Sequence, residues 1–149
     1  MTQVTLVKRN VLFLCTGNSA RSQMAEGLVN HLRSDEWHAV SAGTHPTGYV
    51  HPDAIAVLKE IGIDISAARS KSADEFREVP FDLVITVCDD AAENCPLWLG
   101  LGKRTHIGFH DPGKASGNDE QVLAAFRAVR DAIQQQVIPF LDSFGKEAR

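Results

Sequence analysis

The 149-residue sequence contains no hydrophobic run long enough to cross a membrane. The longest apolar run near the N-terminus covers residues 11–15, whereas a spanning helix needs about 18–20 apolar residues. A polar Thr-Gly-Asn-Ser stretch ends that run, and no apolar core of a secretory signal follows it. We therefore expect a cytoplasmic protein that has no targeting segment and no contact with a membrane.

The sequence also lacks an excess of positive charge, because 15 Lys and Arg face 19 Asp and Glu, for a net charge of −4. Nucleic acids and anionic membranes attract basic proteins, so neither is an expected partner. Cysteine is scarce, and three is an odd number, which argues against a secreted scaffold stapled by disulfides. Each cysteine therefore needs its own explanation.

The composition is that of an ordinary globular protein, with 44% hydrophobic and 23% charged residues. A chain of this length buries enough apolar surface to fold without metals or disulfides. We expect one domain over residues 1–149, with loose tails at residues 1–9 and 145–149.

Apolar runs and helical periodicities alternate along the chain. Residues 11–14 are wholly apolar, as in a strand buried on both faces, and the spacing of Met24, Leu28 and Leu32 predicts a helix from Arg21. Further strands are predicted at residues 37–42, 82–87 and, less clearly, 105–109. Helices are predicted at residues 51–61, as a single turn at 72–76, and from 118 to about 140, with a bend near Pro139. The alternation predicts an α/β fold with four parallel strands and helices on both faces of the sheet.

The strongest chemical signal is CTGNSARS, residues 15–22, between the first strand and the following helix. Ligands bind at this edge of open α/β sheets, where backbone N–H groups and the helix dipole attract an anion. The same field favours the thiolate of Cys15, a nucleophile, and Ser22 can donate a hydrogen bond to its sulfur. The planar fork of Arg21 can bind two oxygens of a tetrahedral anion. The expected oxyanion-binding residues are Thr16, Gly17, Asn18, Ser19, Ala20 and Arg21.

The alternative interpretation is that Cys15 is a small buried residue at a strand end and Arg21 a solvated residue at a helix start, because the Cys-x5-Arg spacing alone is a weak signal. The serine that follows the arginine, together with the position between strand and helix, favours the nucleophile.

Asp111 and Pro112 follow the last predicted strand, at the same edge of the sheet. Cleaving a P–O or As–O bond leaves an oxygen that needs a proton, so Asp111 is a candidate general acid. The alternative is a simple turn, which Asp-Pro pairs often open.

Cys88 and Cys95 flank six mostly polar residues directly after the clearest strand. This spacing does not fit a zinc ribbon. A disulfide requires Cα atoms within about 4.4–6.8 Å, so a helical segment here would have to unwind to form one. Two ordinary free thiols are the alternative interpretation.

Residues 11–27, VLFLCTGNSARSQMAEG, resemble the low-molecular-weight tyrosine phosphatase superfamily and especially its thioredoxin-coupled arsenate reductase branch. The resemblance continues through residues 41–43, 63–66, 87–96 and 111–112, and so covers most of the chain. It implies a three-layer α/β sandwich whose four-stranded parallel sheet has the order 2-1-3-4.

The resemblance also implies a reaction that reduces arsenate to arsenite. Cys15 attacks arsenate while Asp111 protonates the departing oxygen, and Cys88 then forms a Cys15–Cys88 disulfide as arsenite leaves. Cys95 next attacks Cys88, and thioredoxin reduces the resulting Cys88–Cys95 disulfide, with thioredoxin reductase and NADPH upstream. No bound cofactor is implied, and the expected partners of this monomer are an arsenate or phosphate oxyanion and thioredoxin. The implied catalytic residues are Cys15, Arg21, Ser22, Cys88, Cys95 and Asp111.

Two other functions stay open. The first is a low-molecular-weight protein tyrosine phosphatase that hydrolyses phosphotyrosine or small phosphate esters through a phosphocysteine. Phosphatases of the superfamily usually place a tyrosine after the Asp-Pro pair, but Gly113 stands here and Tyr49 is the only tyrosine. The second is an oxyanion-binding or redox-sensing module without catalysis.

No metal is expected. Asn18, Glu26 and Ser41 match positions that bind potassium in some relatives, but Lys71 stands where those relatives carry an aspartate. Its ammonium group can take the place of the cation. We interpret the two histidines His106 and His110 as surface residues, and the two tryptophans, at positions 37 and 98, as packing residues.

Overall fold

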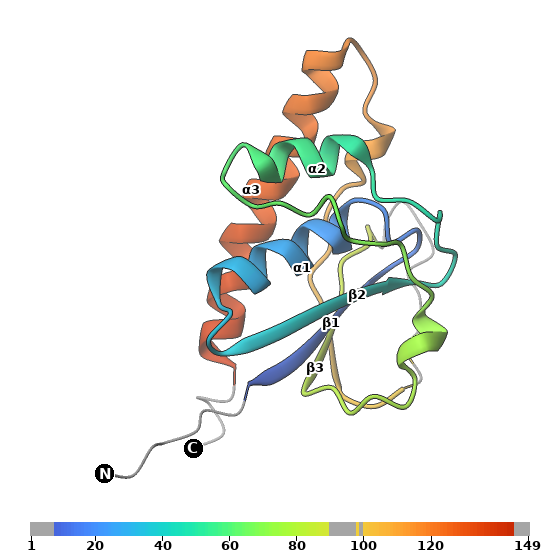
Figure 1. Ribbon diagram of the computed structural model, residues 1–149, viewed down its shortest axis with the longest axis vertical. Helices are drawn as coiled ribbons and strands as arrows, with labels where there is room; N and C mark the ends of the chain where they lie inside the picture. The colour runs from blue at the N-terminus through green and yellow to red at the C-terminus, as the bar shows by residue number, and fades with distance from the viewer. Residues whose placement is uncertain (1–7, 90–97, 99, 145–149) are drawn as a thin grey trace.

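The computed structural model describes residues 8–89, 98 and 100–144 of the chain. Four parallel strands form one sheet in the order β2-β1-β3-β4, which confirms the predicted topology (Figure 1). The strands are β1 (Arg9–Cys15), β2 (Trp37–Gly43), β3 (Leu83–Thr86) and β4 (Lys103–His106). The helices are α1 (Arg21–Leu32), α2 (Pro52–Lys59) and α3 (Asp119–Ser143), with 3-10 turns η1 (Ala73–Phe76) and η2 (Pro112–Lys114).

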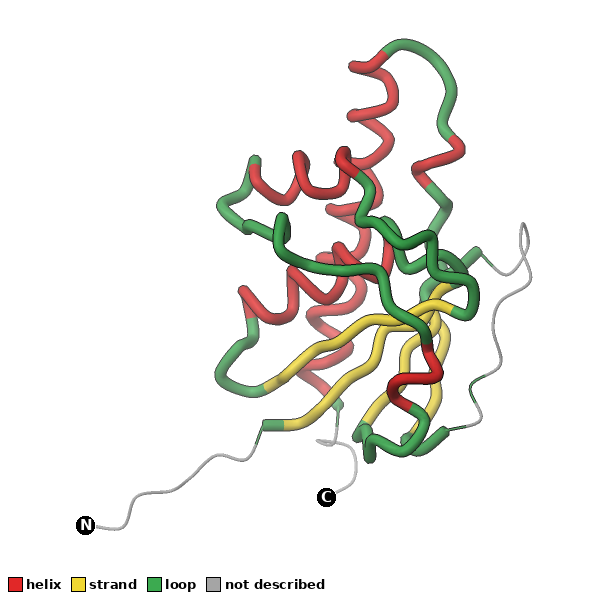
Figure 2. Tube along the Cα trace, turned by 45° about the vertical axis from the view of Figure 1, so that its right-hand side comes forward, coloured by secondary structure: helices red, strands yellow, loops and turns green. Residues whose placement is uncertain are grey.

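Side chains of β1 alternate between two hydrophobic clusters. Val11 and Phe13 point into the larger cluster, which also holds the buried faces of α1, α2 and α3. Leu12 and Leu14 point into the smaller one on the opposite face, where η1 and Trp98 cover the sheet. In Figure 2 the helices α1, α2 and α3 lie on one side of the sheet and the short η1 lies on the other. Helices were predicted on both faces of the sheet. Among the described residues, the only helical element on the second face is this single 3-10 turn.

The ends of α2 and α3 follow from local chemistry. His51 caps α2 by accepting a hydrogen bond from Asp53 N, and Pro52 occupies the first turn. Asn118 caps α3 in a reciprocal capping box with Gln121. Helix α3 ends later than the predicted position near residue 140, because it continues through Pro139 to Ser143. Val137, Ile138 and Leu141 are buried in the core and hold this last part of the helix in place despite the proline.

The weakest predicted strand was placed too late in the chain. The structure puts β4 at Lys103–His106 rather than at residues 105–109, because β4 is an exposed edge strand made of polar residues. The apolar residues on which the prediction was based, Ile107 and Phe109, come just after β4. Their backbone N–H groups still bond to the end of β3 and the residue that follows it. Ile107 N donates to Thr86 O at 3.0 Å, and Phe109 N donates to Val87 O at 3.1 Å.

The other strands lie close to their predicted positions. β3 is one residue shorter at each end than predicted, and β1 starts at Arg9, which pairs with Trp37. Arg9 therefore belongs to the sheet rather than to a loose tail, while residues 1–7 and 145–149 lie outside the described part. Within the described part, no helix has the length and apolar character needed to cross a membrane.

Candidate active site

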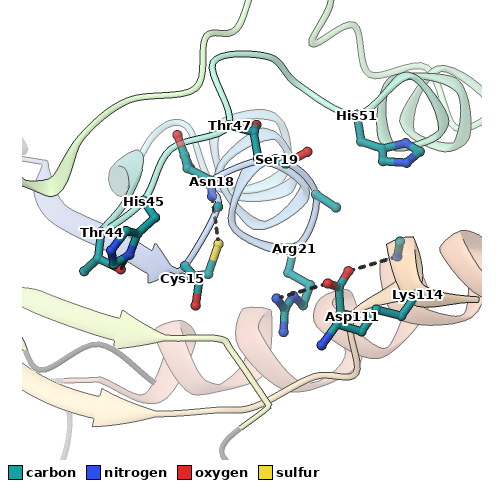
Figure 3. Close-up of a pocket in the computed structure, with 14 residues that line it drawn as sticks. Cys15, Asn18, Ser19, Arg21, Thr44, His45, Thr47, His51, Asp111 and Lys114 are labelled. Atoms are coloured by element: carbon teal, nitrogen blue, oxygen red, sulfur yellow. Dashed lines mark hydrogen bonds and ion pairs between the residues drawn. The ribbon is translucent and has the colours of Figure 1, made fainter. Parts of the chain in front are cut away.

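A pocket of about 620 Å³ opens at the C-terminal edge of the sheet (Figure 3). All seven residues of the loop after β1, residues 15–21, line it, as does Asp111. The structure therefore brings together the predicted nucleophile, oxyanion loop and acid. Sequence reasoning missed the other side of the pocket, which is formed by Thr44, His45, Thr47, His51, Gly113 and Lys114.

The loop after β1 (residues 15–21, hereafter the oxyanion loop) is fixed from outside through its carbonyl groups. The backbone N–H groups of His45, Thr47 and His51 donate to the carbonyl oxygens of residues 16, 17 and 19, at 2.9, 3.0 and 2.9 Å. A trans peptide carries its C=O and N–H on opposite sides, so the N–H groups of residues 17, 18 and 20 face the other way. Asn18 N accordingly donates to Cys15 Sγ at 3.3 Å. The loop thus offers several backbone donors on the side of the thiol, an arrangement suited to an anion.

Asn18 and Ser22 orient a hydroxyl proton toward the thiol. Asn18 is buried and adopts a left-handed conformation, with φ of 48°. Its Nδ2 donates to Ser22 Oγ at 2.8 Å, and Ser22 Oγ lies 2.9 Å from Cys15 Sγ. Because the asparagine occupies a lone pair of the serine oxygen, the hydroxyl hydrogen is available to the sulfur. A thiolate at Cys15 therefore accepts two hydrogen bonds, from Ser22 and from its own loop.

Arg21 connects the oxyanion loop to the segment that carries Asp111 (residues 109–113, hereafter the acid loop). Its side chain is only 5% exposed, and Nη1 donates to Phe109 O at 3.2 Å. Nη2 lies 3.8 Å from Asp111 Oδ2, while Asp111 Oδ1 accepts a hydrogen bond from Gly113 N at 2.9 Å. Asp111 keeps 29% of its side chain exposed, so it faces both the guanidinium and the open pocket (Figure 3).

Gly43, at the end of β2, allows the oxyanion loop to lie against the sheet. A Cβ atom there would overlap the carbonyl oxygen of Thr16 and come within 3.0 Å of Asn18 N. No side chain fits this position. This role of Gly43 could not be predicted, since a close backbone approach leaves no mark in a single sequence.

Lys71 lies beside Glu26 and Ser41, the residues that match a potassium site in some relatives. Its Nζ is 3.6 Å from Glu26 Oε1 and donates to Arg69 O at 2.9 Å, and Ser41 Oγ donates to the same glutamate oxygen at 3.0 Å. The ammonium group thus supplies the positive charge that Glu26 faces. Among the described residues, no group of three or more His, Cys, Asp or Glu side chains is arranged to hold a metal ion.

The remaining histidines and tryptophans match their predicted settings. His106 and His110 are exposed, and His110 Nδ1 lies 2.9 Å from Asp89 Oδ2. Both tryptophans are buried, Trp37 at 2% exposed and Trp98 at 4%.

Cys15 is the last residue of β1, and Cys88 lies just beyond the end of β3, the strand that pairs with β1. Val87 N donates to Leu14 O at 3.0 Å, so Cys15 and Cys88 each follow directly on this bonded pair. Cys15 is a buried free thiol, whereas Cys88 is fully buried and disulfide-bonded. Cys95, the third cysteine of the predicted relay, lies outside the described residues.

Comparisons with known proteins agree with this geometry. The chain is 46% identical over 136 residues to an arsenate reductase of Halalkalibacterium halodurans, which covers 91% of this chain and 97% of the relative. It is 44% identical over 133 residues to an arsenate reductase of Bacillus subtilis, covering 89% of this chain and 95% of the relative.

Solved structures show the same fold. An arsenate reductase in a phosphate-binding state superposes with a TM-score of 0.73 at 31% identity, over 92% of this chain and 99% of the other. A low molecular weight protein tyrosine phosphatase from T. tengcongensis gives 0.74 at 27% identity, over 92% and 100%. A thioredoxin-dependent arsenate reductase from Corynebacterium glutamicum gives 0.63 at 27% identity, over 94% of this chain and 65% of that one.

The family profile described as low molecular weight phosphotyrosine protein phosphatase matches residues 10–149, which include every described residue of the pocket. With nearly the whole chain matched and the oxyanion loop, arginine and acid loop in one pocket, the chain belongs to the low molecular weight phosphotyrosine protein phosphatase family.

Proposed function

We propose that the chain is a single-domain arsenate reductase that transfers electrons through three cysteines and is regenerated by thioredoxin. The observation that carries the proposal is the state of the two described cysteines. Cys15 is a free thiol in the oxyanion loop, and Cys88, just beyond the end of the neighbouring strand β3, is disulfide-bonded. A relay that moves oxidation away from the nucleophile passes through this state before the reductant acts. The arsenate reductases at 44–46% identity support the same assignment.

In the first step, the Cys15 thiolate attacks the arsenic atom of arsenate. The backbone N–H groups of the oxyanion loop and the guanidinium of Arg21 hold the arsenate oxygens. Asp111, in its protonated form, gives its proton to the departing oxygen, which leaves as water. An S–As bond forms and an As–O bond breaks, with no change in the oxidation state of arsenic.

In the second step, the thiolate of Cys88 attacks the sulfur of Cys15. The S–As bond breaks and its electron pair stays on arsenic, so As(V) becomes As(III) and arsenite leaves. The two sulfurs are oxidised to the Cys15–Cys88 disulfide. Cys95 then attacks Cys88, which forms the Cys88–Cys95 disulfide and releases the Cys15 thiolate for another cycle.

Thioredoxin is the proposed reductant, and the cytoplasm the proposed compartment. A dithiol donor is required because each turnover leaves one disulfide, and a reducing compartment keeps that donor charged. The structural relative from Corynebacterium glutamicum, which is described as thioredoxin-dependent, supports this choice. No bound cofactor takes part in the proposed steps, and we propose that the enzyme acts as a monomer.

The test couples arsenate reduction to NADPH oxidation with thioredoxin and thioredoxin reductase. Wild type is expected to consume NADPH only when arsenate is present, and Cys15→Ser, Cys88→Ser and Cys95→Ser to consume none above background. Ser143→Ala, which removes a hydroxyl that donates to Phe140 O near the end of α3, serves as a folded control. Turnover that survives both Cys88→Ser and Cys95→Ser would show that the relay is wrong.

The second candidate is hydrolysis of a phosphate monoester at the same pocket. The family profile and the phosphatase with a TM-score of 0.74 favour it, since a Cys-Arg-Asp set also forms and hydrolyses a phosphocysteine. An aryl phosphate distinguishes the two functions. A phosphatase hydrolyses it rapidly in the Cys88→Ser variant, and shows no arsenate-dependent loss of NADPH.

A further inference from the structure

We infer that Gln23 is a positioning residue that directs the hydrogen-bond donors of the oxyanion loop toward the oxyanion and the thiol. The inference rests on the proposed role of Cys15 and adds a residue to its machinery. Gln23 lies in the first turn of α1, is fully buried, and does not line the pocket. It acts through its neighbours in the loop.

The first contact of Gln23 sets the orientation of a peptide group. Its Nε2 donates to the carbonyl oxygen of Asn18 at 3.2 Å. Neighbouring loop carbonyls are held by backbone N–H groups from residues 45–51, but the carbonyl of Asn18 is held by this side chain. Because the N–H of a trans peptide points opposite to its C=O, the bond turns the N–H of Ser19 toward the anion side. Gln23 thereby completes the row of donors.

The second contact sets the orientation of an amide. Gln23 Nε2 donates to Asn18 Oδ1 at 2.9 Å, and Lys71 N donates to the same oxygen at 2.8 Å. With two donors on its oxygen, the amide of Asn18 must direct Nδ2 toward Ser22 Oγ. That bond in turn leaves the Ser22 hydroxyl hydrogen for the sulfur of Cys15. Gln23 thus influences the thiol through a chain of three side chains.

A third hydrogen bond and one unpaired acceptor oxygen show that the surroundings fix this orientation of the Gln23 amide. Nε2 also donates to Arg69 O at 2.8 Å, so three acceptor oxygens share the two hydrogens of one nitrogen. The other end of the amide, Oε1, is buried and has no hydrogen-bond partner among the described residues. Reversing the amide would bring oxygen against three oxygens, so the surroundings fix the donor inward even though the acceptor stays unpaired.

The test uses Gln23→Met, which keeps the approximate volume and removes every donor. In the oxidised protein Cys15 is the free thiol, so its alkylation by iodoacetamide is followed across pH by mass spectrometry of the intact chain. We expect the midpoint of the rate profile to move up by about one pH unit, and protection by inorganic phosphate to need about tenfold more phosphate. The control, Asn30→Leu, lies on the same helix and removes two hydrogen bonds to Ala39, away from the loop.

The control separates positioning from stability. Both variants are expected to lower the melting temperature, but only Gln23→Met is expected to move the pH profile and the phosphate protection. If Gln23→Met melts earlier and leaves both readouts within twofold of wild type, Gln23 is merely structural and the inference is overturned. Should Gln23→Met fail to fold, Gln23→Asn replaces it, because its shorter amide does not span both oxygens of Asn18. Unchanged readouts in that variant also overturn the inference.

Neither readout requires arsenate to be reduced. Shifted profiles in a protein that reduces no arsenate would contradict the proposed function and leave Gln23 in its positioning role. Unshifted profiles in a protein that reduces arsenate would overturn the positioning role of Gln23 and leave the proposed function standing.

Discussion

One guanidinium, that of Arg21, faces the pocket from a nearly buried position and also touches the acid loop. Its two terminal nitrogens contact Phe109 O and Asp111 Oδ2. A lysine at this position would keep the charge but would lose the planar pair of donors that matches two oxygens of a tetrahedral anion. We therefore predict that Arg21→Lys lowers kcat/KM for arsenate by about 100-fold, or ~2.7 kcal/mol.

The matched control is Arg33→Lys. Arg33 also uses a fork, with Nε and Nη2 donating to Asp142 at 2.7 and 2.9 Å, but it does not line the pocket. Its replacement is expected to leave kcat/KM within about twofold of wild type. Equal losses in the two variants would show that a general effect of the exchange, rather than oxyanion binding, lowers the activity.

Gly43 provides a second prediction about a single residue. Its alanine variant must displace the peptide between Thr16 and Gly17, so Gly43→Ala is expected to lower the free energy of unfolding by about 1–3 kcal/mol. It should also weaken phosphate binding, measured by calorimetry, by at least about tenfold. Gly62→Ala is the control, because its φ of +83° costs about 1–2 kcal/mol at a position with open space around the Cβ. Phosphate affinity that falls equally in both would contradict the role of the close approach.

Helices α2 and α3 are joined by a cluster of charges around Glu60. Arg127 Nε lies 3.0 Å from both carboxylate oxygens of Glu60, and Arg130 Nη1 donates to Oε1 at 2.9 Å. The hydrogen bond from Arg127, with that from Arg130 and both positive charges, holds the pKa of Glu60 below its ordinary value. A carboxylate with a lowered pKa stabilises the fold above its ordinary pKa, and this contribution is lost as the pH falls through the folded value.

Wild type should therefore be more stable than Glu60→Gln at pH 7, and the difference should shrink as the pH falls below about 4.5, the ordinary value for this group. Urea unfolding of both proteins between pH 7 and pH 3 measures the two curves. Because the cluster is at the surface, 1 M salt should also reduce the difference at pH 7. A difference that grows toward low pH would mean that the sign of the effect is wrong.

The sequence predicted the elements whose side chains are buried in a regular pattern. The helical spacing predicted the start of α1 at Arg21, and the apolar run of residues 11–14 predicted the buried part of β1, which extends from Arg9 to Cys15. It predicted β4 poorly because the residues of an exposed edge strand carry no apolar pattern. It ended α3 early because a proline is a local signal, whereas the burial of Leu141 is a tertiary one.

The whole protein also gives a prediction about its thiols. The chain has three cysteines, and the proposed relay stores one disulfide per turnover when no reductant is present. Protein treated with arsenate in the absence of thioredoxin, then denatured without reduction, should show one thiol by titration. The same protein after dithiothreitol should show three, and three thiols after arsenate treatment would rule out the relay.

Only part of the candidate site could be predicted from the sequence. The residues from Cys15 to Ser22 are contiguous and lie at a strand–helix junction, so their chemistry was visible from the sequence. His45, Thr47 and His51 enter the pocket because their backbone N–H groups bind the oxyanion loop, and any residue except proline can make such bonds. Their contribution becomes visible only when the loop after β2 is folded over the loop after β1.

The exposed edge of the sheet has a consequence for solubility. In the described part of the chain β4 pairs with β3 and is the last strand of the sheet, and an edge strand is where a strand of another molecule can add. Lys103 and Arg104 are consecutive on this edge, both are exposed, and their side chains point to opposite faces of the sheet, so each face carries a cation. A second copy that docks its own β4 there in either direction brings two cations against two cations, which disfavours growth of the sheet from molecule to molecule. The residues that concealed β4 from sequence patterns therefore protect the folded protein against fibril-like association, and Lys103→Val with Arg104→Val should bring light scattering at concentrations where wild type stays clear.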